Sequence, residues 1–251
     1  MQLGLSGRRV LVTGGSRGIG RACAVSLAQE GATVAINYVS NDAAAERTYQ
    51  DLLAIGVKAY RFKADVTDLQ AVRNLLAEMN ETVGGIDVLV HSAGISLPDD
   101  AASPETWDRV IRSHLYSTYY LCHEIAEIMK SQRWGRIIAI GSIAGRGSGA
   151  SAYSVGKAAQ SHYVRGLAPI LGPFNITVNV VSPGRINTDM IPGTPEDWGA
   201  FARAHIPVYH DRNDYPGPEL IGEVVSFLAS EQASYISGAD LPACGAAYTG
   251  L

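Results

Sequence analysis

Three side chains in this sequence could transfer a proton to or from an alcohol oxygen. Tyr153 and Lys157 are four residues apart at the start of a predicted helix, so they share one face. Ser142 lies eleven residues earlier, just past a predicted strand. A free phenol has a pKa of about 10, too high for efficient acid-base catalysis at neutral pH, and a neighbouring ammonium lowers it. Ser142 could orient and polarise the substrate oxygen. A tyrosine and a lysine at this spacing also occur by chance in many helices, so the prediction depends on the convergence of all three side chains.

A glycine-rich turn near the N-terminus could bind a phosphate. The apolar residues 10–12 end in Thr13, and Gly14, Gly18 and Gly20 follow before a helical pattern begins. Glycines allow a sharp turn at the end of a strand, and the free N–H groups and dipole of the next helix favour an anion. The spacing G-x-x-x-G-x-G is one residue looser than the usual dinucleotide pattern, so the stretch alone could also be only a tight corner.

The composition indicates a globular protein and excludes several classes of function. The chain has 251 residues, 47% of them hydrophobic and 18% charged, and a net charge of −4 argues against nucleic acid as a partner. The apolar runs are too short to cross a bilayer, and the first residues lack the pattern of a signal peptide. We therefore expect a cytoplasmic protein without a membrane partner. We expect neither disulfides nor a metal site, because the spacing of the cysteines and of several histidines fits neither: Cys23, Cys122, Cys244, His162, His205 and His210.

Strand-like and helix-like segments alternate along the whole chain, with no linker or repeat. The pattern predicts an α/β fold, a single-domain doubly wound parallel sheet of about seven strands with helices on both faces, over residues 1–251. The predicted strands are 9–12, 33–37, 58–63, 88–92, 135–140, 177–181 and 237–241, and the predicted helices are 18–30, 43–55, 69–83, 104–131, 152–171 and 219–230.

Ligands bind such sheets beyond the carboxyl ends of the strands, which places the segments after the strands in one cleft. These segments are 14–20, 37–40, 65–66, 92–94, 141–151 and 183–190. Residues 190–218 follow the sixth strand and contain the aromatic residues Trp198, Phe201, Tyr209 and Tyr215. We interpret this excursion as a substrate lid; the alternative is a surface loop packed on its own aromatic residues.

The motifs together resemble the short-chain dehydrogenase/reductases, in the branch similar to 3-oxoacyl-carrier-protein reductase, which includes many sugar, polyol and cyclic alcohol dehydrogenases. The matching stretches are Thr13-Gly14-x3-Gly18-x-Gly20, Asp65-Val66, Ser92-Ala93-Gly94, Ser142, Tyr153-x3-Lys157 and Pro183-Gly184-Arg185-Ile186-Asn187-Thr188. The likeness covers nearly the whole chain.

This resemblance implies a Rossmann-type fold and hydride transfer between a nicotinamide ring and a carbonyl or alcohol. It implies that Tyr153 is the acid/base, that Ser142 holds the substrate oxygen, and that Lys157 lowers the pKa of the tyrosine and bonds the nicotinamide ribose. It also implies a homotetramer in which the helices 104–131 and 152–171 form the contact. The cofactor-binding residues expected besides Tyr153 and Lys157 are Gly14, Ser16, Arg17, Gly18, Ile19, Gly20, Asn37, Tyr38, Ser40, Asp65, Val66, Ser92, Ala93, Gly94, Pro183, Gly184, Ile186 and Thr188.

The choice of cofactor follows from charge. An acidic residue at the end of the second strand would bind the ribose hydroxyls of NAD and repel a 2′-phosphate, but residues 37–40 contain none and the first carboxylate is Asp42. Arg17 in the glycine loop could pair with that phosphate, or could be a solvated side chain. We expect NADP(H), with NAD(H) as the alternative.

Two positions depart from the family pattern. Ser92 replaces the usual asparagine after the fourth strand, and His114 stands where the family has its fourth catalytic residue, also an asparagine. Histidine can bond water and titrates near neutrality, so His114 could replace that asparagine in a proton relay; it could also be structural.

The predicted function is oxidation or reduction of a secondary alcohol or ketone, with a small or cyclic substrate. One alternative is a catalytically silent NADP-binding regulatory protein, suggested by His114. A lyase or dehalogenase that uses the same serine and tyrosine would be expected to lose the glycine loop, which this chain keeps.

Two further residues lead to expectations. Arg146 lies in a loop, 143–152, that looks shorter than usual, and it could bind a substrate carboxylate or be exposed to solvent. Pro169 lies inside a predicted helix, which it should kink or locally break.

Overall fold

Apolar strands form the centre of the molecule. The structure is a computed structural model that describes residues 3–97, 103–147, 149–190, 194–212 and 214–248. Seven parallel strands form one sheet, as the sequence predicts, and their order is β3-β2-β1-β4-β5-β6-β7. The strands are β1 (Arg9–Thr13), β2 (Thr33–Tyr38), β3 (Ala59–Lys63), β4 (Val88–His91), β5 (Gly135–Ile140), β6 (Ile176–Pro183) and β7 (Asp240–Ala243).

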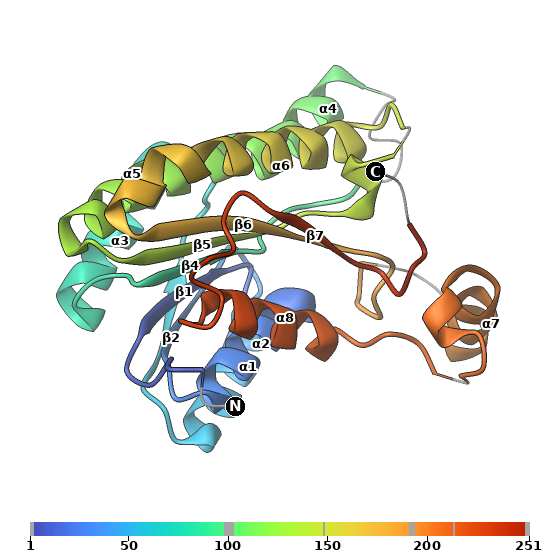
Figure 1. The fold of residues 1–251 in the computed structure, drawn as a ribbon, viewed down its shortest axis with the longest axis horizontal. Coiled ribbons are helices and arrows are strands. Elements are labelled where there is room, and N and C mark those ends of the chain that lie inside the picture. The colour runs from blue at the N-terminus through green and yellow to red at the C-terminus, as the bar shows by residue number, and fades with distance from the viewer. Residues whose placement is uncertain (1–2, 98–102, 148, 191–193, 213, 249–251) are drawn as a thin grey trace.

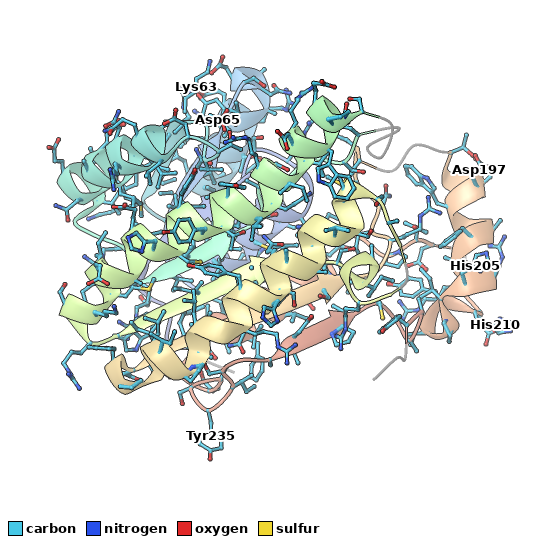
Figure 2. All side chains as sticks on the ribbon, turned by 90° about the horizontal axis from the view of Figure 1, so that it is seen from above. Lys63, Asp65, Asp197, His205, His210 and Tyr235 are labelled. Carbon is cyan, nitrogen blue, oxygen red and sulfur yellow. The ribbon has the colours of Figure 1, made fainter. Side chains whose placement is uncertain are left out.

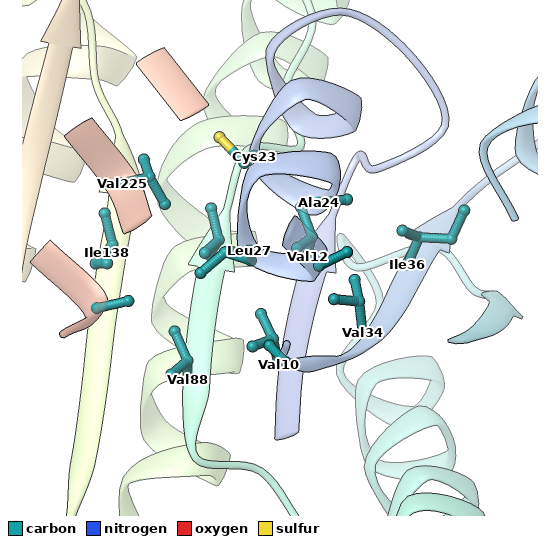
Figure 3. Packing of buried hydrophobic residues seen from close by; sticks show 14 of the residues in the cluster. Val10, Val12, Cys23, Ala24, Leu27, Val34, Ile36, Val88, Ile138 and Val225 are labelled. Atoms are coloured by element: carbon teal, nitrogen blue, oxygen red, sulfur yellow. The ribbon is translucent and has the colours of Figure 1, made fainter. Parts of the chain in front are cut away.

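Helices cover both faces of this sheet (Figure 1). One layer consists of α1 (Gly18–Gln29), α2 (Asp42–Ile55) and α8 (Glu219–Ala229), and the other consists of α3 (Leu69–Val83), α4 (Pro104–Ile111), α5 (Ser117–Gln132) and α6 (Ala152–Leu171). Each layer buries its own hydrophobic cluster against the sheet. Figure 3 shows the first cluster, in which Leu27 of α1 packs near Val10 and Val12 of β1.

The strand order reverses between β1 and β4, and this reversal defines the cleft. The chain leaves β1 through Gly14, whose φ of +66° favours glycine. A Cβ on Gly14 would lie 2.9 Å from the backbone of Ala93, which follows β4. The turns after β1 and β4 therefore meet at the carboxyl edge of the sheet, where such folds bind their ligands.

Three sequence predictions need correction. The predicted helix 104–131 is divided, because a π-helical turn, η1 (Arg112–Tyr116), separates α4 from α5. The last strand begins at Asp240 rather than at Ser237, because Gly238 turns with a φ of +80° and Ser237 bonds β6 through its side chain. Pro169 does not break α6, since it lies in the last turn and costs at most one backbone hydrogen bond.

The segment after β6 contains a helix of its own. α7 (Pro195–His205) begins with a capping box between Thr194 and Asp197, and the short helix η4 (Pro207–Tyr209) follows it. α7 stands beside the sheet, beyond the strand ends, and Figure 2 labels Asp197 and His205 on it. The sequence predicts only a weak helical pattern here, at residues 197–204.

In the part of the chain that the structure describes, no helix is long and apolar enough to span a membrane. The same residues include no group of three or more His, Cys, Asp or Glu side chains that could hold a metal ion.

A serine cap determines where α6 begins. Ser151 accepts a hydrogen bond from the backbone N–H of Ser154 at 3.1 Å. We predict that Ser151→Ala lowers the free energy of unfolding by about 1 kcal/mol, whereas Ser151→Asp, which keeps an acceptor, retains most of the stability. Denaturant unfolding of both variants measures the difference, and equal losses in the two would contradict a capping role.

Candidate active site

Ser142 and Tyr153 meet at the carboxyl end of β5. Ser142 caps the short helix η2 (Ile143–Gly145), and its Oγ accepts a hydrogen bond from Ala144 N at 3.1 Å. Tyr153 lies in the first turn of α6 and shares a side-chain hydrogen bond with Ser142. Burial raises the pKa of the Tyr153 phenol, and the hydrogen bond with Ser142 opposes that rise. The two hydroxyls predicted from the sequence are therefore brought together.

Lys157 lies one turn further along α6, and its side chain is buried. Its Nζ donates to Ile140 O at 2.6 Å, which ties α6 to the end of β5. A second bond runs from Nζ to Gln160 Oε1 at 3.1 Å. Burial lowers the pKa of Lys157 to about 7. The lowering of the tyrosine pKa by this lysine stays a prediction.

His114 packs against the aromatic ring of Tyr153. The ring centroids are 5.2 Å apart in an edge-to-face arrangement. Two glycines make room for the imidazole: a Cβ on Gly94 would lie 2.7 Å from its Nδ1, and one on Gly156 would lie 3.2 Å from its Cβ. Histidine 114 therefore sits in the catalytic corner, in a π-helical turn of the kind often found at functional sites.

The hydrogen bonds of His114 define its protonation. Nε2 lies 2.9 Å from Ile95 O, and because a carbonyl only accepts, Nε2 carries the proton. Nδ1 is buried with no hydrogen-bond partner among the described residues. Burial and the nearby Lys157 charge hold the pKa of His114 well below its ordinary value. The expectation that this residue titrates near neutrality is therefore wrong.

A second buried histidine lies at the end of β4. His91 Nδ1 is 2.7 Å from Thr13 Oγ1, and His91 Nε2 is 3.0 Å from Ser117 Oγ. Thr13 Oγ1 in turn accepts a bond from Ala93 N at 3.3 Å. This network joins β1, β4 and α5 directly beneath the turn that carries Ser92, Ala93 and Gly94. Burial lowers the pKa of His91 to about 3, so it is neutral and acts as a structural tie.

The glycine loop fits a pyrophosphate. The helix α1 begins at Gly18, and its N-cap residue, Arg17, makes no side-chain cap, so the first N–H groups of the helix remain available. Gly18 has a φ of +54°, and a Cβ there would lie 3.4 Å from Thr188 across the cleft. Ser16, Ile19 and Gly20 belong to the same loop and helix start. Pro183 ends β6, and Gly184, Ile186 and Thr188 continue from it toward the loop.

The residues at the end of β2 are arranged differently from the prediction. Asn37 is buried, and its Nδ2 donates to Ala64 O at 2.9 Å, so this side chain bonds the end of β3 and does not face the cleft. Tyr38 donates to Asp42 Oδ1 at 2.9 Å, and Lys63 pairs with the same carboxylate at 2.8 Å. Ser40 is exposed. Asp42, the first carboxylate after β2, is thus already paired.

Other predicted cofactor residues lie at the same edge of the sheet. Asp65 accepts hydrogen bonds from both the backbone and the hydroxyl of Thr67, and Val66 is buried beside it. Arg17 is exposed and pairs with Asp189 at 3.6 Å, so the glycine loop and the segment after β6 are in contact.

Arg146 does not point to a substrate carboxylate. Its Nη1 lies 3.5 Å from Asp240 Oδ1 and donates to Asp240 O at 3.1 Å. Asp240 also accepts bonds from Ser161 and Ser182. Neither alternative in the sequence prediction anticipates this ion pair, which fixes the loop after β5 to β7.

The aromatic residues after β6 pack largely on one another. Trp198 and Tyr215 have ring centroids 5.9 Å apart, and the guanidinium of Arg185 lies 4.3 Å from the ring of Phe201. Tyr209 is buried in a small cluster with Ala202 and Ile206. Self-packing, the alternative to the lid, therefore accounts for much of this aromatic content.

The doubly wound sheet and the grouping of Ser142, Tyr153 and Lys157 at its carboxyl edge define a class of α/β proteins, and comparisons with known proteins identify the family. The family described as enoyl-(acyl carrier protein) reductase matches residues 14–245. The chain is 36% identical to a 3-oxoacyl-(acyl-carrier-protein) reductase of Aquifex aeolicus, covering 95% of this chain and 96% of that one. It is 33% identical to a cyclohexanol dehydrogenase of a Rhodococcus species, covering 97% of each chain.

Solved structures give the same result. A dehydrogenase/reductase from Sinorhizobium meliloti superimposes with a TM-score of 0.88 at 35% identity, over 99% of this chain and 98% of that one. A 7α-hydroxysteroid dehydrogenase solved with NADH and 7-oxo glycochenodeoxycholic acid has a TM-score of 0.88 at 30% identity, over 97% and 95% of the two chains. The chain belongs to the short-chain dehydrogenase/reductases, in the branch of the 3-oxoacyl-carrier-protein reductases. It is an oxidoreductase of that family, whose named relatives here are reductases and dehydrogenases.

His91, Thr118 and Gln160 also belong to this site, although the sequence did not predict them. Gln160 could have been found from helical spacing, because it lies three residues after Lys157 and seven after Tyr153 on one face of α6. His91 offered a weaker signal, a polar residue at the end of an apolar strand.

Burial of Lys157 should make the stability of the protein depend on pH. The pKa of Lys157 in the folded chain, about 7, lies below its ordinary value of 10.5, so the unfolded chain binds more protons between these two pH values. Burial of the charged lysine therefore lowers the free energy of unfolding in full below pH 7, and this loss disappears as the pH rises toward 10.5. We expect Lys157→Met to gain melting temperature relative to wild type at low pH and to lose that advantage as the pH rises. A difference in melting temperature that is constant with pH would contradict the lowered pKa.

Proposed function

We propose that this protein transfers a hydride between NADP(H) and a ketone or secondary alcohol, with a small or cyclic substrate, using Ser142, Tyr153 and Lys157. The observation that carries the proposal is the shared hydrogen bond of Ser142 and Tyr153 at the carboxyl end of β5, with the buried ammonium of Lys157 one turn away. A cyclohexanol dehydrogenase and a hydroxysteroid dehydrogenase among the similar proteins support a cyclic substrate.

The residues divide the chemistry as follows. A nicotinamide cofactor held by the glycine loop and Lys157 would supply or accept the hydride at the carbon of the substrate. Ser142 and Tyr153 hydrogen-bond the substrate oxygen and so fix its orientation. In reduction, Tyr153 gives its phenolic proton to the oxygen as negative charge develops there, and in oxidation it takes the proton back. Lys157 favours the phenolate through its charge. His114 stays neutral and supports the ring of Tyr153 from the side.

The experiment is a turnover assay with a panel of cyclic and linear ketones and alcohols, followed by reduced-nicotinamide absorbance. We expect Tyr153→Phe to lower kcat by about a thousandfold, because general acid-base catalysis by one side chain contributes on that order, while the affinity for the cofactor is retained. Because this substitution removes only the hydroxyl and keeps the aromatic ring, a loss of turnover cannot be due to altered packing. Equal turnover in Tyr153→Phe and wild type would contradict the proposal.

A second outcome of the same assay separates the silent regulatory alternative. If wild type binds NADP(H) and turns over no member of the panel, the next variant to assay is His114→Asn, which restores the residue usual in the family. Activity gained by that change would identify a silenced member of the family and would contradict the proposed function. Unchanged turnover of an active wild type in His114→Asn is the result we expect, because His114 is neutral and its hydrogen bond goes to a backbone carbonyl.

The preference for NADP(H) is proposed from charge at the end of β2. The carboxylate of Asp42 is paired with Lys63, and Arg17 is exposed in the glycine loop with only a long contact of 3.6 Å to Asp189. A guanidinium in this position can bind a 2′-phosphate with charge-assisted hydrogen bonds. The hydroxysteroid dehydrogenase solved with NADH makes NAD(H) the alternative to exclude.

We predict that Arg17→Ala raises the KM for NADPH by about tenfold and leaves the KM for NADH nearly unchanged, as expected for the loss of a charge-assisted hydrogen bond. Arg21→Ala is the matched control, because Arg21 on the same helix pairs with Asp51 outside the cleft. Steady-state kinetics with both cofactors measure the effect. An equal rise for NADH and NADPH in Arg17→Ala would contradict a phosphate contact.

We also infer that the protein works as a homotetramer in the cytoplasm. Tyr116 and Tyr119 near the start of α5 and Val155 of α6 expose apolar surface on the helices expected to form the contact. The three cysteines are free and buried, as is usual in a reducing compartment.

A further inference from the structure

The Lys157 ammonium is held by a neutral side chain. An ammonium has three N–H donors, and two of those of Lys157 are taken by Ile140 O at 2.6 Å and Gln160 Oε1 at 3.1 Å. One donor is left for the cleft. The carbonyl of Ile140 belongs to the strand and is fixed, so Gln160 is the side chain that decides how the ammonium is oriented.

Gln160 is itself held in a continuous chain of hydrogen bonds. Its Nε2 donates to Thr118 Oγ1 at 2.9 Å, and the Thr118 hydroxyl donates to the carbonyl of His114. Gln160 and Thr118 are both completely buried. The Thr118 hydroxyl takes one N–H of the amide and the Lys157 ammonium takes its oxygen, so the orientation of the amide is fixed, with its oxygen toward Lys157. An unpaired amide would be costly in such a place, and the pairing therefore specifies one arrangement.

Among the described residues, no carboxylate is paired with Lys157. The titratable groups that its charge affects are His114 of η1 and His91 of β4, and Tyr153 lies one turn before it on α6. Both histidines are neutral, because burial depresses their pKa values. The positive charge beside Tyr153 is therefore supported by two neutral acceptors, and Gln160 is the only one of them that a side-chain substitution can remove.

We propose that Gln160 is a positioning residue of this active site: it fixes the Lys157 ammonium one helical turn from Tyr153, and Thr118 anchors it to the π-helical turn that carries His114. This inference rests on the proposed function, because it requires that Tyr153, assisted by Lys157, transfers the proton of an alcohol. The chain of contacts ends at a backbone carbonyl, so it fixes the lysine and conducts no proton further into the protein.

The test removes the acceptor without changing the size of the side chain much. Formation of the Tyr153 phenolate favours the ammonium form of Lys157. In Gln160→Leu this form loses an acceptor that stabilises its charge, so the phenol should titrate at higher pH. We expect kcat to fall by about tenfold at neutral pH, and the basic shift to appear in the pH profile of kcat/KM. If Gln160→Leu does not fold, Gln160→Met keeps the length of the side chain and serves instead.

The titration of Tyr153 is read from tyrosinate absorbance, as the difference between each protein and the same protein carrying Tyr153→Phe. Thr118→Val should shift this titration in the same direction as Gln160→Leu but less. The double variant should match Gln160→Leu alone, because Thr118 acts only through Gln160. Ser161→Ala is the matched control on the next residue of α6, where the hydroxyl bonds Asp240 instead, and it should leave the titration unchanged.

This readout separates the inference from the proposed function, because it needs no substrate. A shifted titration in Gln160→Leu supports the positioning role even where the wild type turns over no ketone, a result that would count against the proposed function alone. If the wild type is active and folded Gln160→Leu has the same Tyr153 titration and the same pH profile, the positioning role alone is overturned. Additive effects of Thr118→Val and Gln160→Leu would overturn the anchoring by Thr118.

Discussion

A buried ammonium at the end of β5 is the interaction on which the rest of this site depends. Lys157 reaches from α6 to the carbonyl of Ile140, and this bond fixes the first turn of α6 over the carboxyl end of the strand. Tyr153 is on that turn, and Ser142 follows the same strand, so one tie between a helix and a strand brings the two hydroxyls together. Burial of a charged group is unfavourable for folding, and here it is retained where chemistry needs it.

The sheet supplies the second half of the site through its reversal of strand order. The turns after β1 and β4 meet so closely that Gly14 has no room for a side chain beside Ala93. The buried network of Thr13, His91 and Ser117 holds these turns together from beneath. The glycine loop therefore presents the free start of α1 at a fixed distance from the corner that holds Tyr153. The glycine loop after β1 and the corner that holds Tyr153 after β5 thus lie at the same edge of one sheet, with β4 between them.

The parts of this fold that follow from local sequence could be predicted. Apolar runs such as residues 10–12 identify the strands, and the alternation with helices gives the parallel sheet. Tyr153, Lys157 and Ser142 could be grouped because each lies next to a strand end or on one helical face. The amide of Asn37 could not be assigned, because its partners lie on β3 and depend on how two strands pair.

Contacts between distant segments account for the remaining differences. Arg146 pairs with Asp240, 94 residues away, and no local pattern indicates that pair. The π-helical turn that carries His114 packs beside Gly94 and Gly156, and the local pattern of residues 112–116 does not indicate these neighbours. The neutral state of His114 likewise follows from burial, which the residue type alone does not reveal.

The central claim is that a hydride crosses this cleft between a nicotinamide and a carbonyl carbon. Transfer of deuterium from NADPH labelled at the reactive position of the nicotinamide, to a cyclic ketone such as cyclohexanone, tests it directly. The account predicts one deuterium on the carbinol carbon of the product, found by mass spectrometry with wild type and nearly absent with Tyr153→Phe. An alcohol product that carries no deuterium from the labelled NADPH would contradict it.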